Sequence, residues 1–106
     1  MKLSKQHQLS FAQQLLNLLN ADLALLNAIE LIRSSTPKAR QAWLHKIEIL
    51  LRKGNGFSQC LESQGELFSI EFINLIRISE RTGNLELALN TICQQLETQI
   101  ELRQKV

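Results

Sequence analysis

One short segment combines charged side chains with a signal that ends a helix. Glu80 and Arg81 stand at the end of a helical pattern of apolar residues, just before Gly83 and Asn84. Gly83 can adopt the left-handed conformation that closes a helix, and Asn84 can cap the helix that follows. A carboxylate in the last turn of a helix opposes the helix dipole. We therefore expect a further group to hold Glu80.

Two roles for this segment stay open. Glu80 can be held within the chain, by Arg77, by Arg81 or another basic side chain, or by backbone N–H groups of the turn, which is the commoner fate of such a charge. It can also contact a partner protein. The candidate site is a structural turn at Glu80, Gly83, Asn84 and Leu85, with possible partner contacts at Glu80, Arg81 and Glu86.

No combination of residues indicates catalysis, a metal or a cofactor. His7 and His45 each stand alone, without a second His or Cys at the spacing of metal ligands. The Gly54–Asn55–Gly56 break lacks the Lys and Ser/Thr that follow in a phosphate-binding loop. No Ser has the surroundings of a nucleophile elbow. We predict that the domain is not an enzyme and has no cofactor.

The remaining reactive or aromatic residues fit a packing role. Cys60 and Cys93 lie on apolar helical faces, which predicts two reduced, buried thiols that act as small hydrophobic residues. Trp43 is expected in the core or at its rim rather than as a stacking platform.

Composition favours a soluble helical domain. The chain has 106 residues, of which 44% are hydrophobic and 21% charged, with 4 Gly and 1 Pro. This length suits one domain with a real core. The net charge of +2 gives no electrostatic case for nucleic acid. No run approaches the roughly 20 apolar residues of a membrane span, and the N-terminal residues lack the hydrophobic stretch of a signal peptide. The chain as given is predicted to be soluble and cytoplasmic.

Apolar periodicity and helix-capping residues predict three helices in the first half of the chain. The first runs over about 8–20, and the second follows Asp22, which is expected to be its N-cap. The third is expected to begin with Thr36 as the cap and Pro37 in the first helical position, and Gly54 ends it. Its inward stripe is expected at Ala39, Trp43, Ile47, Leu50 and Leu51.

Three more helices are expected after the Gly54–Gly56 break. The fourth is the shortest, over roughly 58–63, the fifth begins near Ser69, and the sixth begins after Asn84. The fold class is all-α, a compact six-helix bundle with short connections. We expect one core that contains Leu15, Leu19, Leu25, Ile29, Ile47, Leu50, Leu61, Phe72, Ile76, Leu89 and Leu96.

Residues 78–86, Ile-Ser-Glu-Arg-Thr-Gly-Asn-Leu-Glu, resemble the turn signature of the type II secretion F family, roughly Ile-Gly-Glu-x-Ser/Thr-Gly-x-Leu-Glu. Residues 11–29 are similar to the opening helix pair of that family, and 51–61 to its middle motif. Phe68 and Phe72 match the aromatics before the turn. Residues 96–106 resemble the polar helix end that enters the first membrane span. The resemblance covers residues 8–106.

Three positions depart from the family pattern. Asp22 stands where the family usually has Gly, Gly56 stands where a capping Ser is common, and Ser79 replaces the Gly before the motif Glu. Each residue is expected to fit its local geometry, since Asp caps, Gly tolerates a cap position and Ser fits within a helix. The expected fold is therefore unchanged.

The resemblance implies a non-enzymatic assembly module. Residues 1–106 would be a single cytoplasmic domain of a longer, polytopic platform protein in the bacterial inner membrane, serving type IV pilus or type II secretion assembly. The implied partners are an assembly ATPase, other inner-membrane subunits, pilin-like subunits and a second copy in a homodimer. The implied mechanism is mechanical, with a rigid bundle that transmits movement of the ATPase to the membrane helices.

Two further expectations concern the sixth helix. The alternative function is that of a helix-turn-helix domain that binds nucleic acid, in which this helix would be the recognition helix that contacts the bases. It carries Glu86 and Glu97, with no Lys or Arg before Arg103, which disfavours that role. Arg103 and Lys105 suit the cytoplasmic flank of a membrane span, so we expect a hydrophobic helix to follow Val106. The turns beyond about residue 99 are expected to fray or project.

Overall fold

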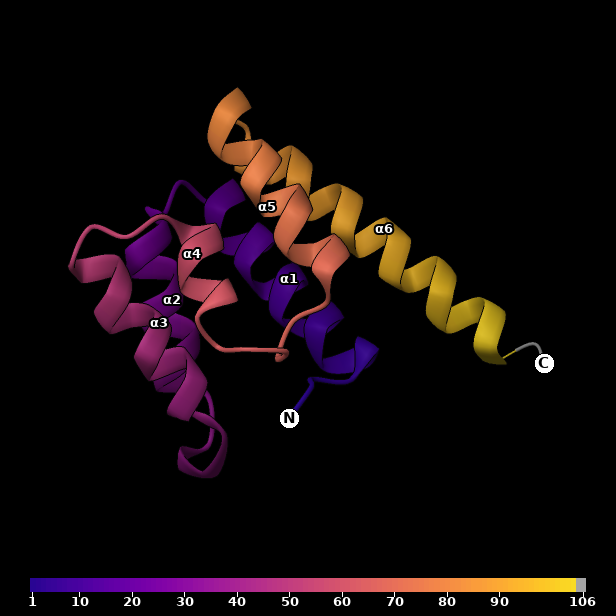
Figure 1. The fold of residues 1–106 in the computed structure, drawn as a ribbon, viewed down its shortest axis with the longest axis horizontal. Helices are drawn as coiled ribbons and strands as arrows, with labels where there is room; N and C mark the ends of the chain where they lie inside the picture. The colour runs from indigo at the N-terminus through magenta and orange to yellow at the C-terminus, as the bar shows by residue number, and fades with distance from the viewer. Residues whose placement is uncertain (105–106) are drawn as a thin grey trace.

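The computed structural model of the protein describes residues 1–104, and this range contains helices and no β-strand (Figure 1). Each α-helix packs against the next one along the chain, and the last also packs against the first, so that the helices close around one core. The all-α fold with six helices is confirmed. The elements are α1 (Lys5–Asn20), α2 (Leu25–Ser35), the 3₁₀ helix η1 (Lys38–Arg40), α3 (Ala42–Arg52), α4 (Phe57–Glu62), α5 (Ile70–Thr82) and α6 (Leu85–Gln104).

The observed helix ends agree best with the predicted ones where a side chain or a glycine determines the end. Ser69 is the N-cap of α5, as expected near that residue, and its hydroxyl accepts from the Phe72 N–H. The fourth helix is the shortest α-helix, as predicted. α1 begins at Lys5 instead of near Gln8, because the Ser4 hydroxyl accepts a hydrogen bond from the His7 N–H and caps the helix earlier.

The expected cap at Asp22 is wrong. Asp22 has φ of 68°, and α2 begins only at Leu25, without a side-chain cap. The Asp22 N–H donates to the Leu19 carbonyl and the Leu23 N–H to the Leu18 carbonyl. These two bonds close the end of α1 in the Schellman pattern, in which the residue after the helix is left-handed and usually glycine. Asp is one of the few other residues that tolerates this conformation.

The expected start of the third helix is also wrong. The Thr36 hydroxyl donates back to the Ile32 carbonyl at 2.7 Å, so Thr36 closes α2 and does not cap the next helix. Pro37 precedes the 3₁₀ helix, which the sequence did not predict, and α3 begins at Ala42. Ala39 is exposed within the 3₁₀ helix and does not belong to the inward stripe of α3.

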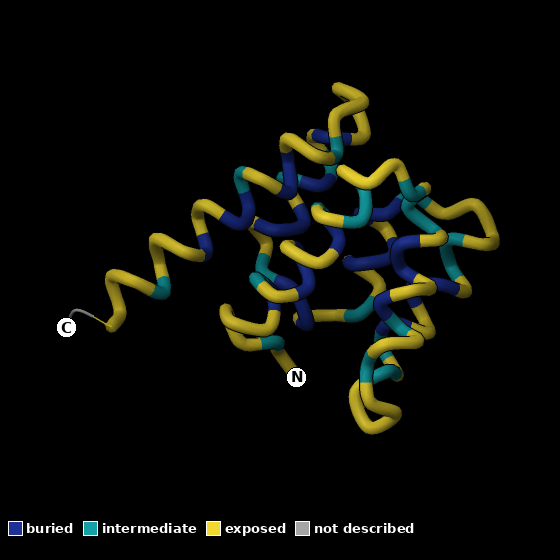
Figure 2. The backbone as a smooth tube through the Cα atoms, turned by 180° about the vertical axis from the view of Figure 1, so that it is seen from behind, coloured by how far each residue is buried: buried dark blue, intermediate teal, exposed yellow. Residues whose placement is uncertain are grey.

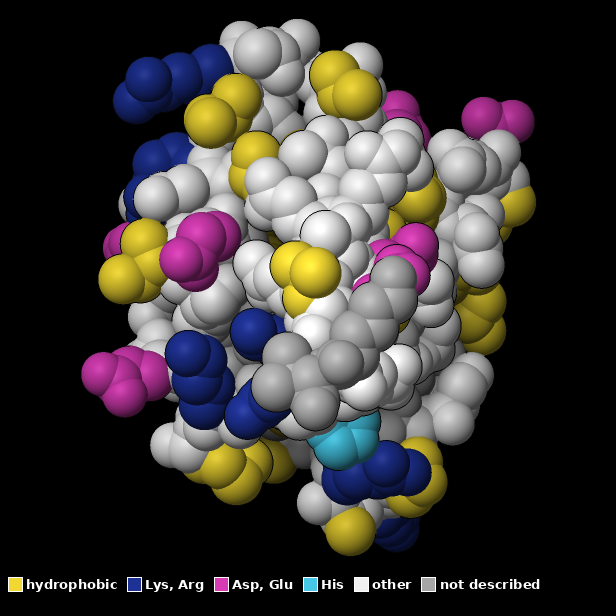
Figure 3. All heavy atoms as spheres, turned by 90° about the vertical axis from the view of Figure 1, so that its right-hand side faces the viewer, with side chains coloured by type: hydrophobic (Ala, Val, Ile, Leu, Met, Phe, Trp, Pro, Cys, Tyr) yellow, Lys and Arg dark blue, Asp and Glu magenta, His cyan; other side chains and the backbone are white. Residues whose placement is uncertain are grey.

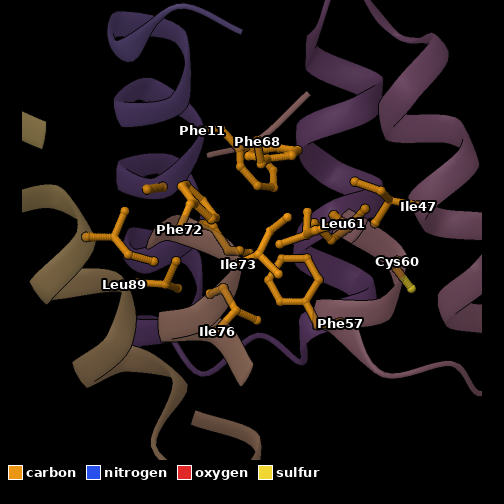
Figure 4. Close-up of a cluster of buried hydrophobic side chains, with 14 of the residues drawn as sticks. Phe11, Ile47, Phe57, Cys60, Leu61, Phe68, Phe72, Ile73, Ile76 and Leu89 are labelled. Carbon is orange, nitrogen blue, oxygen red and sulfur yellow. The ribbon is translucent and has the colours of Figure 1, made fainter. Parts of the chain in front are cut away.

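The core lies inside this closed arrangement (Figures 2 and 4). The expected core residues are buried, except that Leu19, Leu25 and Leu50 are only partly buried and pack against its edge. Cys60 and Cys93 are buried free thiols, as predicted, and burial raises the pKa of both. The core also contains residues outside the expected set, among them Ala12, Ala28, Leu44 and Leu67.

An aromatic cluster fills one side of this core. The ring of Phe11 lies 5.0 Å from that of Trp43 in an edge-to-face arrangement, and Phe68 lies 4.9 Å from Phe72. Such contacts are worth about 0.5–1.5 kcal/mol beyond the buried area. Trp43 is half-buried, so it is a rim residue, in agreement with the packing role expected of it. The cluster joins α1, α3 and the segment that leads into α5.

A buried carboxylate joins α2 to α3. Glu48 is 7% exposed and forms ion pairs with Arg33 and with Arg52, the latter at 3.1 Å. Arg52 also pairs with Glu30 at 2.7 Å. Burial by itself raises the pKa of Glu48, but hydrogen bonds from the two arginines outweigh that effect and hold the pKa below its ordinary value. Periodicity of apolar residues gives no sign of this network.

We predict that the network makes stability depend on pH. Because the pKa of Glu48 is lower in the folded chain, its contribution is present above the ordinary glutamate pKa and is lost as the pH falls through the folded value. Urea denaturation measures the free energy of unfolding at pH about 7 and about 3. Between these two values it should fall less for Glu48→Gln than for the wild type. An equal fall in both proteins would show that other groups carry the pH dependence.

We predict that Leu89→Ala lowers the free energy of unfolding by about 2–5 kcal/mol, because Leu89 is fully buried and truncation leaves a cavity. Leu87→Ala is the control on the same helix, since Leu87 is 59% exposed and should change stability by less than about 0.5 kcal/mol. Chemical denaturation measures both. Similar effects of the two substitutions would contradict the core position of Leu89.

Candidate functional site: the α5–α6 turn and the start of α4

The turn between α5 and α6 is built from two backbone devices. Gly83 has φ of 74°, and its N–H donates to the Ser79 carbonyl at 2.8 Å. A residue with a side chain is disfavoured in this left-handed conformation. The Asn84 Oδ1 accepts from the Leu87 N–H at 3.0 Å, which is an N-cap bond for α6. Leu85 then packs against the edge of the core.

Glu80 does not point to this turn but to the start of α4. Its Oε2 accepts from the Ser58 N–H at 3.2 Å, and its Oε1 accepts from the Ser58 hydroxyl at 2.5 Å. The arginines considered from sequence are not its partners within residues 1–104. Arg77 instead pairs with Glu62 at 2.6 Å and donates to Asn74.

This contact acts as a helix cap supplied from another helix. The N-cap residue of α4 is Gly56, which has no side chain to accept from the first N–H groups of the helix. The Glu80 carboxylate takes that role at the Ser58 N–H, while the Gln59 Oε1 accepts from the Gly56 N–H at 3.4 Å. A negative charge that is unfavourable at the end of α5 is favourable at the start of α4.

The special feature of Gly56 is its close approach to Glu80 rather than its backbone conformation. Its φ of −65° and ψ of 151° suit any residue. A Cβ added at this position would lie 2.8 Å from the Glu80 Oε2, which is too close for a real contact. A side chain at 56 would therefore push the Glu80 carboxylate away from Ser58. Gly56 and Glu80 form one structural unit, although they lie in different motifs of the sequence.

Ser79 also has a local structural role. Its side chain is buried, and its hydroxyl donates to the Ile76 carbonyl one turn earlier at 2.6 Å. Ser79 therefore fits within the helix, as expected for this departure from the family pattern.

The other charged residues of the candidate site face the solvent. Arg81 is exposed in the last turn of α5, and Glu86 is exposed in the first turn of α6. Neither has an ion pair with another residue of the 1–104 range. The role of these two residues as partner contacts stays a prediction, while Glu80 is already occupied by its bonds to Ser58.

No group of three or more His, Cys, Asp or Glu side chains in residues 1–104 is placed to hold a metal ion. None of the helices in that range combines the length and the apolar character that crossing a membrane requires.

These features define an all-α domain whose polar site serves to hold helices together. Residues 11–106 match the profile of the family described as type II secretion system (T2SS), protein F, and the chain belongs to this family. It is 33% identical over 97 residues to the type IV pilus assembly protein PilC of Thermus thermophilus and 31% identical to the type 4 fimbrial assembly protein PilC of Pseudomonas putida. Each alignment covers 91% of this chain.

A third relative is the protein transport protein HofC homolog of Haemophilus influenzae, 28% identical over 88% of this chain. The chain spans only about a quarter of the length of these relatives, 24%, 24% and 23% respectively. The match shows the family of this domain.

We predict that Glu80→Ala lowers the free energy of unfolding by about 1–2 kcal/mol, because α4 loses its cap. Gly56→Ala should also be destabilising in the wild type, since the new methyl group displaces Glu80. In a Glu80→Ala background the same change should cost less, by at least about 0.5 kcal/mol. Urea denaturation of the four proteins measures this coupling.

Gly83→Ala provides the matched control. Its cost arises from the backbone conformation at φ of 74°, and no side chain lies near the added Cβ. The cost should therefore be the same with and without Glu80. Additive effects of Gly56→Ala and Glu80→Ala would mean that the close approach has no energetic consequence.

Proposed function

We propose that this chain is a non-enzymatic cytoplasmic domain of an inner-membrane platform protein for type IV pilus or type II secretion assembly. In this proposal it couples an assembly ATPase to the insertion of pilin or pseudopilin subunits. The family match over residues 11–106 and the pilus-assembly relatives support the general role. The observation that carries the mechanical part is the geometry of α6.

α6 is 20 residues long, and its buried residues end at Leu96. Ala88, Leu89, Ile92, Cys93 and Leu96 are its buried residues, and beyond Leu96 only Ile100 is even partly buried. The remaining turns project from the body of the domain, as one of the two expected outcomes (Figures 1 and 2). A helix of this kind is suited to continue into another part of the protein. Lys105 and Val106, to which the expected membrane span is joined, lie outside the described residues.

The cap at Ser58 makes the anchored part of the domain rigid. Glu80 lies next to the α5–α6 turn, and its bonds to Ser58 fix α4 against that end of α5. α5 in turn packs along α6. In this proposal, a force applied at the turn is passed to α6 through these contacts. This arrangement supports a role in transmission.

In this proposal the ATPase or another assembly subunit binds the tip formed by the α5–α6 turn. Arg81 and Glu86 present charges of opposite sign on the two sides of Gly83. Both are exposed and have no ion-pair partner in the described part of the chain. Charged side chains at the rim of an interface mainly set specificity and the rate of association.

The nucleic-acid alternative is not favoured. The helix after the turn carries Glu86 in its first turn, and Arg103 is the first cation along it. A recognition helix needs cations and amides near its start to meet phosphates and bases.

We predict that Arg81→Glu combined with Glu86→Lys, introduced into the full-length protein, weakens co-purification with the assembly ATPase roughly tenfold. The two substitutions together leave the net charge unchanged, so a loss of binding cannot arise from a change in net charge. Lys46→Glu with Glu66→Lys is the matched control, because both residues are exposed and lie away from the turn. Equal binding by the two double variants would remove the tip from the proposed interface.

We also expect the domain to self-associate weakly, as part of a homodimer in the whole protein. Symmetric two-fold contacts are the commonest solution for such assemblies. Sedimentation of the 106-residue chain at increasing concentration should show a rising average mass. A strictly monomeric profile at the highest concentration would contradict a dimer formed by this domain.

A further inference from the structure

The N-terminal segment is fixed to the body of the domain by a buried glutamine. Gln8 is 1% exposed, its Nε2 donates to the Leu3 carbonyl at 2.9 Å, and its Oε1 accepts from the Ser69 N–H at 3.3 Å. The Leu3 N–H donates to the Leu67 carbonyl at 2.9 Å. The segment before α1 therefore has a defined position, and the side chains that it carries face a defined surface.

This segment and α6 border a common hollow of about 290 Å³. Lys2 and Lys5 line it from the N-terminal side, and Gln95 and Gln99 line it from α6. Its one acidic lining residue is Glu71 at the start of α5. Two lysines are thus held beside the half of α6 that leaves the body.

Arg103 continues the same side of α6. Ile92, Leu96 and Gln99 line the hollow at helical spacing, and Arg103 follows Gln99 by four residues. Four residues of helix correspond to one turn, about 6 Å further along the axis. Glu97 lies elsewhere on the helix and accepts a hydrogen bond from Gln13 at 3.2 Å. The side of α6 toward the N-terminal segment therefore ends in a cation.

A view onto this side of the molecule shows the same separation of charge. In Figure 3, most of the Lys and Arg side chains lie on the lower part of the face, and the Asp and Glu side chains lie mainly higher on it. We define the basic face as Lys2, Lys5 and Arg103. Lys2 and Lys5 are exposed, and so is Arg103.

We propose that the basic face lies on the anionic phosphate headgroups of the membrane surface next to which α6 leaves the domain. The inference rests on the proposed function, which places a membrane span after α6. It adds that the folded body itself contacts lipid, through cations that are far from α6 in sequence. The domain would then have a fixed orientation on the membrane instead of hanging from a loose linker.

Charge complementarity and the direction of α6 support this partner. Anionic headgroups attract basic side chains near the surface, and each cation strengthens the association by about fivefold. Lys2 and Lys5 border the same hollow as Gln99 of α6, so one surface can meet both the basic face and the projecting end of α6. The relatives are about four times as long as this chain, which leaves ample sequence for membrane helices.

The test is binding of the 106-residue chain to vesicles of phosphatidylcholine with and without phosphatidylglycerol, measured by co-sedimentation at low salt. We expect binding only with phosphatidylglycerol, and a loss of at least about tenfold for Lys2→Glu/Lys5→Glu. The control Lys46→Glu/Lys53→Glu makes the same change in net charge on the far side of the molecule, at α3 and just after it. It should lose less than about threefold. Circular dichroism verifies that both variants fold.

Three outcomes would overturn the proposal. Equal losses in the two variants would show that only net charge matters, and binding without phosphatidylglycerol would exclude headgroup charge as the cause. Absence of vesicle binding, together with loss of ATPase binding by Lys2→Glu/Lys5→Glu, would assign the face to an acidic protein instead. Each of these results leaves the role of the tip at Arg81 and Glu86 untouched, because that role is tested by co-purification with the ATPase.

Discussion

The packing of α1 against α6 is the constraint on which the rest of this domain depends. The two helices lie at opposite ends of the chain, yet α1 contacts α6 as well as α2, and this contact closes the succession of helices into one body. It buries Leu15 of α1 together with Leu89 and Leu96 of α6 in the common core. Apolar burial contributes about 25 cal/mol per Å². The burial of α6 in this core ends at Leu96, and the turns beyond it project from the body of the domain.

The Glu80 carboxylate affects two helix ends at once, the end of α5 and the start of α4. Glu80 would be unfavourable at the end of its own helix, and α4 begins with a glycine that offers no cap. Placed between them, the carboxylate accepts two hydrogen bonds from Ser58 and fixes α4 against α5. In this chain the carboxylate also occupies the space that a Cβ at position 56 would approach. The motif glutamate is thus a structural residue here, and the charges left for a partner are those of its neighbours.

The sequence predicted the elements because they depend on local signals. Apolar periodicity located the six helices and most of the core, and the caps at Ser69 and Asn84 act through bonds to residues three positions away. The prediction of helix ends failed where one residue type can stand at either end of a helix. Asp22 ends α1 in a left-handed conformation, and Thr36 bonds back into α2, although both are common N-cap residues. Ser58, which holds Glu80, lies 22 residues away from it, and Arg33, one of the two partners of Glu48, lies 15 residues away, beyond any local pattern.

In the proposed function, α6 joins two surfaces with different partners. At its first turn stands Glu86, beside the tip that would meet an assembly subunit, and near its last turn stands Arg103 of the basic face. A continuous helix of 20 residues spans about 30 Å. Its first half is held by the core, and the basic face would hold its second half near the membrane. Movement at the tip would then be passed toward the membrane along α6, because one uninterrupted helix joins the tip to Arg103.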